Sequence, residues 1–174
     1  MNIRPLQPGD SLEDLTALLH ASYASLAAQG WNFTAVDQPV EVTRDRLAGA
    51  QGFVAELGGR LVGTVAVRGP KPLGETYIAD PPPPLYTTPG TAILSQLAAH
   101  PDCRGLGLGE QLIDAAEAWA RDQGFAQLAL DTAEPAVALR RRYERRGYVA
   151  TGSVQWMGKT YASVLMCKLL DDPA

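Results

Sequence analysis

The sequence predicts an α/β protein in which seven strands and four helices follow one another along a single domain, residues 1–174. Stretches of alternating apolar residues, bounded by glycine and proline, are typical of strands. Other stretches repeat apolar residues at spacings of three and four, as amphipathic helices do. A glycine-rich turn at 104–109 joins an apolar strand pattern to the strongest of these helical patterns. Helices interleaved with strands in this way indicate an α/β architecture.

From the N-terminus the predicted order is strand, two helices, three strands, helix, strand, helix and two strands. Gly58-Gly59 between the second and third strands is a strong hairpin signal. The predicted strands are residues 2–6, 52–57, 60–67, 92–99, 127–131, 148–156 and 161–169. The predicted helices are residues 10–29, 39–50, 107–123 and 135–146.

Two local signals refine this outline. Asp10 and Glu13 resemble a capping box, which predicts that the first helix begins at Asp10. Residues 69–91 contain many prolines, with four in succession at 81–84. Proline favours polyproline II and cannot donate a ladder hydrogen bond, so a loop of about 20 residues is expected there.

Composition excludes several classes of protein. The formal net charge of −4 argues against a general surface for nucleic acid or for an anionic membrane. The sequence has no apolar stretch long enough for a signal peptide or a membrane span, so a cytoplasmic protein is the simplest inference. Cys103 and Cys167 have no metal-ligand spacing, and no bound metal is expected.

The segment Arg104–Gly109 is the strongest functional signal. Alternating glycines at the start of a helix leave backbone N–H groups uncovered, and the helix dipole adds partial positive charge there. Such a helix start binds anions, usually phosphate, and Arg104 can add charge-assisted hydrogen bonds. The glycine spacing is neither that of a dinucleotide fingerprint nor that of a Walker loop.

Two motifs resemble one known family. The pattern Arg-x-x-Gly-x-Gly at 104–109 resembles the acyl-CoA pyrophosphate loop of the GNAT N-acyltransferase superfamily. The segment Tyr143-Glu144-Arg145-Arg146-Gly147-Tyr148 is similar to the family's Tyr-Glu-Lys-Leu-Gly-Phe segment. Together with the order of the elements, the resemblance covers essentially the whole chain. It implies the GNAT fold, with a mixed central seven-stranded sheet flanked by about four helices.

The resemblance also implies acetyl-CoA as cosubstrate, without a metal. The pantetheine arm of the cofactor is a chain of amides that, in the family, pairs with the main chain of the fourth strand, here at 97–99. The phosphates then bind the glycine-rich loop. The residues implied in cofactor binding are Leu97, Ala98, Ala99, Arg104, Gly105, Leu106, Gly107, Leu108, Gly109 and Glu110.

Tyr143 matches the position of the family's general acid, a phenol that protonates the departing thiolate. Packing of Tyr143 on the core face of its helix is compatible with that role. The family commonly has an asparagine seven residues earlier, where this sequence has Ala136.

The base that removes the amine proton is left open. Members of the family often place a glutamate on the fourth strand, where this sequence has Ser95 and Gln96. The remaining candidates, each of which also reads as a solvated or capping residue, are Glu75, Asp80 and Glu134. Proton removal through ordered water is therefore the default expectation.

The predicted function is that of an acetyl-CoA-dependent N-acetyltransferase that modifies a primary amine of a small molecule or peptide by direct attack in a ternary complex. Two alternatives stay open: a non-catalytic acyl-CoA-binding module, and an acyltransferase that uses a longer acyl-CoA. Residues 70–90 are expected to border the acceptor pocket, because they join two central strands of the family fold. The acceptor itself and a homodimer are left open.

Overall fold

The computed structural model describes residues 1–71 and 80–170 and confirms the α/β prediction. The sheet has seven strands in the order β1-β2-β3-β4-β5-β7-β6. The strands are β1 (Asn2–Pro5), β2 (Gln51–Leu57), β3 (Arg60–Arg68), β4 (Thr91–Ala99), β5 (Gln127–Ala133), β6 (Val149–Val154) and β7 (Ser163–Leu169). The helices are α1 (Leu12–Ala27), α2 (Val40–Leu47), α3 (Pro84–Thr87), α4 (Leu108–Asp122) and α5 (Val137–Arg145), with short 3₁₀ turns η1 (Thr34–Val36) and η2 (Pro101–Cys103).

The chain divides into two compact units. The first comprises Met1–Arg68 and Leu94–Trp119, and the second comprises Gly69–Ile93 and Ala120–Ala174. Strand β4 therefore belongs to the second unit through Ile93 and to the first from Leu94 onward. The prediction of one domain over 1–174 is not tested by this division and stays a prediction.

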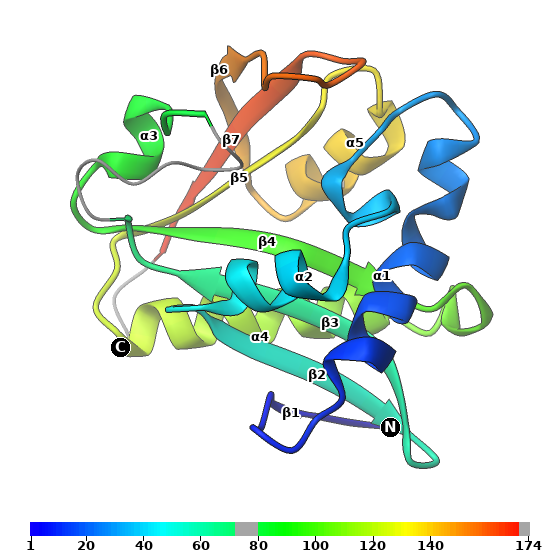
Figure 1. Cartoon of the computed structure of the whole chain (residues 1–174). Coiled ribbons are helices and arrows are strands. Elements are labelled where there is room, and N and C mark those ends of the chain that lie inside the picture. The colour runs from blue at the N-terminus through cyan, green and yellow to red at the C-terminus, as the bar shows by residue number, and fades with distance from the viewer. Residues whose placement is uncertain (72–79, 171–174) are drawn as a thin grey trace. The chain divides into compact units, whose positions relative to one another are not determined.

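In the first unit, β1, β2 and β3 pair antiparallel, and the β2–β3 turn lies at Gly58-Gly59 as the sequence predicts. Helices α1 and α2 lie on one face of these strands and α4 lies on the other (Figure 1). Helix α4 approaches β3 closely at Gly63, where a Cβ atom would come within 2.9 Å of the Leu112 side chain. The absence of a side chain at Gly63 thus allows the helix that follows the glycine-rich loop to pack tightly on the sheet.

The N-cap of helix α1 lies one residue later than the capping-box prediction. Ser11 is its N-cap, and the Ser11 hydroxyl accepts a hydrogen bond of 3.0 Å from the Asp14 amide. Asp10 instead receives two hydrogen bonds from the Arg4 guanidinium, at 2.8 and 2.9 Å. These hydrogen bonds lower the pKa of Asp10. The prediction was wrong because the Asp10 carboxylate pairs with Arg4, 6 residues earlier in the chain, instead of capping the helix.

In the second unit, β5 pairs with β7 and β7 pairs with β6, both antiparallel. The first residues of β4, Thr91–Ile93, pair parallel with β5, so the sheet is mixed. One buried hydrophobic cluster of this unit consists of Tyr86, Ile93, Ala129, Trp156 and Leu165.

Part of the proline-rich segment is helical, which the sequence did not predict. Helix α3 begins at Pro84. The N–H groups in the first turn of a helix have no intrahelical acceptor, so a proline there costs no hydrogen bond. Tyr86 on this helix is 2% exposed and belongs to the core. The end of the predicted loop is therefore anchored, and residues 72–79 lie outside the described part of the chain.

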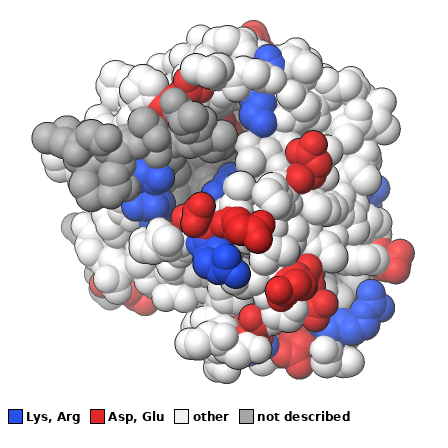
Figure 2. All heavy atoms as spheres, viewed as in Figure 1, with Lys and Arg blue, Asp and Glu red and all other residues white. Residues whose placement is uncertain are grey.

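Charged side chains of both signs are interspersed on the face of the molecule in Figure 2. Within residues 1–71 and 80–170, the structure contains no helix with the length and apolar character needed to cross a bilayer.

Candidate functional site

The glycine-rich loop has the geometry that the sequence predicts. Gly105 and Gly107 have φ values of 79° and 70°, which favour glycine, and a Cβ atom at either position would meet no protein atom within 4 Å. Helix α4 begins directly after them at Leu108, and Gln111 N donates to Gly107 O at 3.1 Å. The backbone at both glycines is thus open to a ligand, at the N-terminal end of a helix of 15 residues.

The remaining residues of this segment divide between packing and exposure. Leu108 is 2% exposed and would contact a Cβ at Gly63, so its side chain belongs to the core. Leu106 is 57% exposed, and its side chain makes no part of that core. Gly109 and Glu110 lie in the first turn of α4. For Leu108 and Gly109, the predicted contact with a cofactor would therefore involve main-chain N–H groups.

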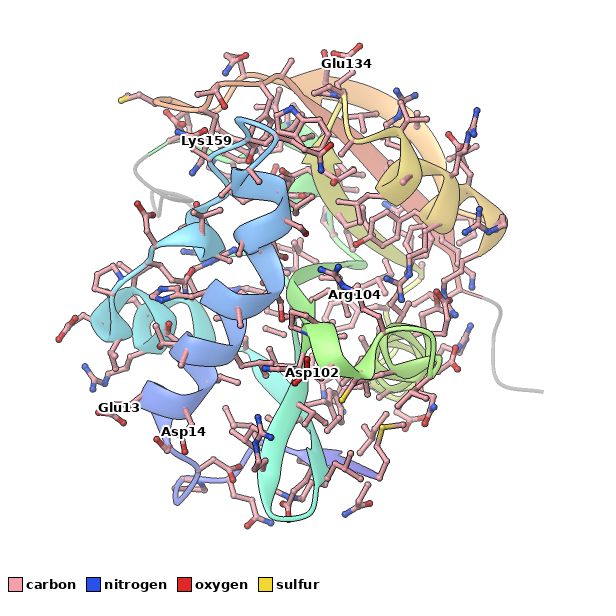
Figure 3. The ribbon with its side chains drawn as sticks, turned by 90° about the vertical axis from the view of Figure 1, so that its right-hand side faces the viewer. Glu13, Asp14, Asp102, Arg104, Glu134 and Lys159 are labelled. Atoms are coloured by element: carbon pink, nitrogen blue, oxygen red, sulfur yellow. The ribbon has the colours of Figure 1, made fainter. Side chains whose placement is uncertain are left out.

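Arg104 precedes the loop on its exposed side. One nitrogen of its guanidinium donates to the Ser25 hydroxyl of α1 at 3.3 Å, and Figure 3 shows the side chain near that helix. This contact holds a positive charge beside the loop while leaving the side chain accessible. Arg104 is thus available to bind the oxygen atoms of a phosphate.

Strand β4 carries the next group of predicted cofactor residues. His100 N donates to Val62 O of β3 at 2.8 Å. Because consecutive residues of a strand direct their hydrogen-bonding groups to opposite edges, Ala98 also faces β3, whereas Leu97 and Ala99 face away from it. We call the edge formed by the main chain of Leu97 and Ala99 the 97/99 edge. The structure thus brings two of the three predicted pantetheine contacts onto one edge and turns Ala98 toward β3.

Gln96, just before this edge, has a backbone conformation that is rare for a residue with a side chain. Its φ is 53°, and its side chain is 5% exposed. The Gln38 amide donates to Gln96 Oε1 at 3.0 Å and to Thr43 Oγ1 at 2.7 Å. Arg46 in turn donates to Gln38 Oε1 at 2.8 Å. This network stabilises a left-handed residue, which by itself costs about 1–2 kcal/mol.

In the second unit, Tyr143 lies near the end of α5 and is 7% exposed. Its ring contacts the Tyr148 ring edge-on, with centroids 5.8 Å apart, and Tyr148 N donates to Tyr143 O at 3.1 Å. Ala136 is the N-cap of α5 and is buried, as Tyr143 is. The catalytic role of Tyr143 stays a prediction.

The sequence matches the family model described as Acetyltransferase (GNAT) family over residues 13–148, which include the glycine-rich loop and Tyr143. The chain belongs to the GNAT acetyltransferase family. No curated protein matches the sequence.

Solved structures share the GNAT fold over nearly their whole length. The ribosomal-protein-S18-alanine N-acetyltransferase from Escherichia coli is 15% identical, with a TM-score of 0.72 over 99% of this chain and 96% of that one. A GNAT family acetyltransferase from Elizabethkingia anophelis with acetyl-CoA bound is 14% identical, with a TM-score of 0.66 over 97% of each chain. A ribosomal-protein-alanine N-acetyltransferase from Brucella melitensis is 23% identical, with a TM-score of 0.65 over 98% of this chain and 100% of that one.

The sequence-predicted base candidates of this GNAT chain have structural partners or lie at the surface. Asp80 accepts a hydrogen bond of 2.6 Å from the Met157 amide, so its carboxylate holds the turn at 157–158. Glu134 is exposed, and Figure 3 shows its carboxylate at the surface. Glu75 lies outside the described residues. Neither of the two described candidates is held in a buried setting that would suit a general base.

Asp131 on β5 is a carboxylate that the sequence reasoning missed. It is partly buried and accepts hydrogen bonds from Tyr86 Oη and from Trp156 Nε1, the latter at 2.9 Å. Asp131 is the one charged residue of the apolar segment 127–131, and a charge within a predicted buried strand indicates a residue with specific partners. The two aromatic donors make Asp131 the polar centre of the second unit's core.

We expect Asp131→Asn to destabilise the protein by about 1–3 kcal/mol. An amide has only one acceptor oxygen, so either the tryptophan N–H faces the NH₂ group without an acceptor, or the tyrosine hydroxyl must accept from that group instead of donating; the remaining bond also loses its charge assistance. Urea denaturation measures the effect, with the exposed Asp122→Asn as a control for loss of one negative charge. Equal denaturation midpoints for the two variants would contradict the assigned role.

Neither cysteine offers a catalytic nucleophile. Cys103 is 6% exposed within η2, and burial raises the pKa of the Cys167 thiol, which keeps it protonated. Over the described ranges, 1–71 and 80–170, no cluster of three or more His, Cys, Asp or Glu residues is arranged to hold a metal ion.

Proposed function

We propose that this GNAT protein is an acetyl-CoA-dependent N-acetyltransferase that transfers the acetyl group to a primary amine. The observation that carries the proposal is the loop 104–109. Two glycines with positive φ and open space precede a long helix, and an accessible arginine lies beside them. This combination suits the pyrophosphate of coenzyme A, because N–H groups, helix dipole and guanidinium all favour negative charge.

The proposed reaction is direct attack in a ternary complex. The amine nitrogen forms a bond to the thioester carbonyl carbon, the carbon–sulfur bond breaks, and the sulfur leaves with the bonding electrons. The sulfur then takes a proton from the Tyr143 hydroxyl, the new amide loses its extra proton to water, and the Tyr143 phenolate regains a proton from solvent. An alkylammonium with a pKa of about 10.4 must lose a proton before it can attack, so turnover should rise with pH in the neutral range.

The acceptor class to test first is the N-terminal amine of a peptide. Two structures with the same fold are named as N-acetyltransferases for alanine of a ribosomal protein. Small-molecule amines are the second class, and we place the reaction in the cytoplasm. Release of free thiol from acetyl-CoA with a panel of peptides and small amines separates these classes.

Arg104→Ala is the first test of the cofactor site. Loss of a charge-assisted hydrogen bond to phosphate should weaken coenzyme A binding about tenfold to hundredfold, as measured by calorimetry. Arg60→Ala, which removes another exposed arginine from the first unit, is the control for net charge. The same coenzyme A affinity in both variants would mean that phosphate does not bind at the loop.

A second candidate is a non-catalytic acyl-CoA-binding module. Gln96 and Ala136 favour it, because neither supplies the carboxylate or the asparagine that catalytic members of the family commonly have at these positions. Tight binding of acetyl-CoA without thiol release, across the whole amine panel, would support this candidate over the enzyme.

A further inference from the structure

One turn of helix α1 contacts the predicted cofactor-binding segment at three points. The Tyr23 hydroxyl donates to Leu97 O at 2.9 Å, and the Ser22 hydroxyl donates to Ala99 O at 2.9 Å. The Ser25 hydroxyl accepts the hydrogen bond from Arg104 that was described above. The two carbonyl groups are those of the 97/99 edge, so consecutive residues of α1 bind both of its acceptors.

The position of these hydrogen bonds has a consequence for the main chain. A carbonyl oxygen has two lone pairs, so each hydroxyl leaves one lone pair of Leu97 O and Ala99 O available. The N–H groups of Leu97 and Ala99 point to the same edge as their carbonyls. Donors and acceptors therefore alternate along the 97/99 edge in the pattern that a chain of amides requires for strand-like pairing.

The two hydroxyl-bearing residues are themselves held in place. The Tyr23 ring contacts the Phe33 ring edge-on, with centroids 5.5 Å apart, and it packs against the buried cluster of Leu19, Ala35 and Ala98. Aromatic pairs of this geometry restrict ring motion and add to the energy of burial. At the other end of the edge, the strained backbone of Gln96 is held by Gln38. The conformation of residues 96–99 is thus restricted by side chains from outside the strand.

We propose that Ser22 and Tyr23 are positioning residues for the pantetheine arm of acyl-CoA. Their hydroxyls hold the 97/99 edge extended before the cofactor arrives, so that binding does not have to order this stretch of main chain. The inference rests on the proposed function, since it concerns the same cofactor. It adds a role for α1, whose Ser22 and Tyr23 side chains align the strand that the cofactor's amides would join.

The test separates the arm of the cofactor from its phosphates. Calorimetry is carried out with coenzyme A and with adenosine 3′,5′-bisphosphate, which keeps the α-phosphate and the 3′-phosphate of the cofactor but lacks its β-phosphate and its pantetheine arm. For Tyr23→Phe and for Ser22→Ala we expect the Kd of coenzyme A to rise about twofold to tenfold, the usual effect of one neutral hydrogen bond. The Kd of the bisphosphate should not change. Arg104→Ala, by contrast, should raise the Kd of both ligands if phosphate binds at the loop.

Matched variants test whether the effect comes from the hydroxyls. Ser22→Thr keeps a hydroxyl and should retain the wild-type Kd for coenzyme A. Tyr161→Phe removes the hydroxyl of a buried tyrosine in the second unit and should also leave the Kd unchanged. In steady-state assays, Tyr23→Phe should raise the KM for acetyl-CoA while kcat stays the same, because the hydroxyl holds the main chain and takes no part in proton transfer.

Two results would overturn the inference. The first is an unchanged Kd for coenzyme A in both Tyr23→Phe and Ser22→Ala. The second is tighter binding, which would mean that the hydroxyls compete with the pantetheine arm for the two carbonyls. Failure of the proposed function is distinguishable in either form: without the cofactor site, wild-type protein would bind neither coenzyme A nor the bisphosphate, and without the reaction it would bind coenzyme A but release no thiol from acetyl-CoA.

Discussion

Replacement of Tyr143 with phenylalanine is expected to lower kcat by a factor of about 10²–10⁴, the range found for loss of one proton-transfer partner. A phenol has a pKa of about 10 and the departing thiol has a pKa of about 8.5, so proton transfer over a short distance suits this pair. Loss of the hydroxyl would leave the thiolate to depart unprotonated. The effect should appear in kcat when the chemical step limits the rate.

The environment of Tyr143 makes phenylalanine a conservative replacement. The side chain is 7% exposed and packs edge-on against Tyr148, so removal of one oxygen keeps the ring contact and its burial. Thermal stability and coenzyme A affinity should therefore change little. Both can be measured on the protein that is used for the kinetics.

Tyr148→Phe is the matched control for this experiment. Tyr148 is 2% exposed and contacts the Tyr143 ring, so the control removes a neighbouring hydroxyl from the same cluster. Its kcat should equal that of the wild type. A Tyr143→Phe variant with the kcat of the control, in an assay limited by chemistry, would leave Tyr143 as a packing residue, and the general acid would have to be sought elsewhere.

The elements of the fold were largely predictable because their signals are local. The strand at 92–99 and the helix at 107–123 both lie within one residue of β4 and α4. Their apolar periodicity coincides with the burial that the structure requires. The start of α1 was misplaced because Asp10 binds Arg4, and helix α3 was missed because four successive prolines indicated a loop. In both places a tertiary contact outweighed the local preference.

The candidate site was predictable to a lesser extent. The loop 104–109 carries its own signal, since positive φ at Gly105 and Gly107 requires the residue type that the sequence shows. The contacts of Ser22 and Tyr23 with β4 carry no such signal, because their partners lie 77 and 74 residues away. Only the packing of α1 on the strand brings these groups together. The left-handed conformation of Gln96 is likewise a product of its buried partner and not of its residue type.

Gly107→Val is expected to weaken coenzyme A binding by more than the backbone strain of a valine at this position would cause. A valine at φ 70° adopts a backbone conformation that costs about 1–2 kcal/mol of stability. Its Cβ atom would meet no protein atom within 4 Å, so the protein itself has room for the side chain. The branched methyl groups would instead occupy the space that a phosphate must enter to reach the backbone N–H groups. We therefore expect at least about a tenfold rise in the Kd of coenzyme A and of adenosine 3′,5′-bisphosphate.

Gly124→Val separates the strain from the loss of ligand space. Gly124 follows helix α4, has φ 79° and likewise has no protein atom within 4 Å of an added Cβ. The two variants should lose similar amounts of stability in urea denaturation, whereas only Gly107→Val should lose affinity for the two ligands. If both variants bound coenzyme A with the wild-type Kd, phosphate would not approach the main chain at 105–107. The cofactor site would then have to be placed away from the start of α4, because binding of phosphate at the glycine main chain is the reason for placing it there.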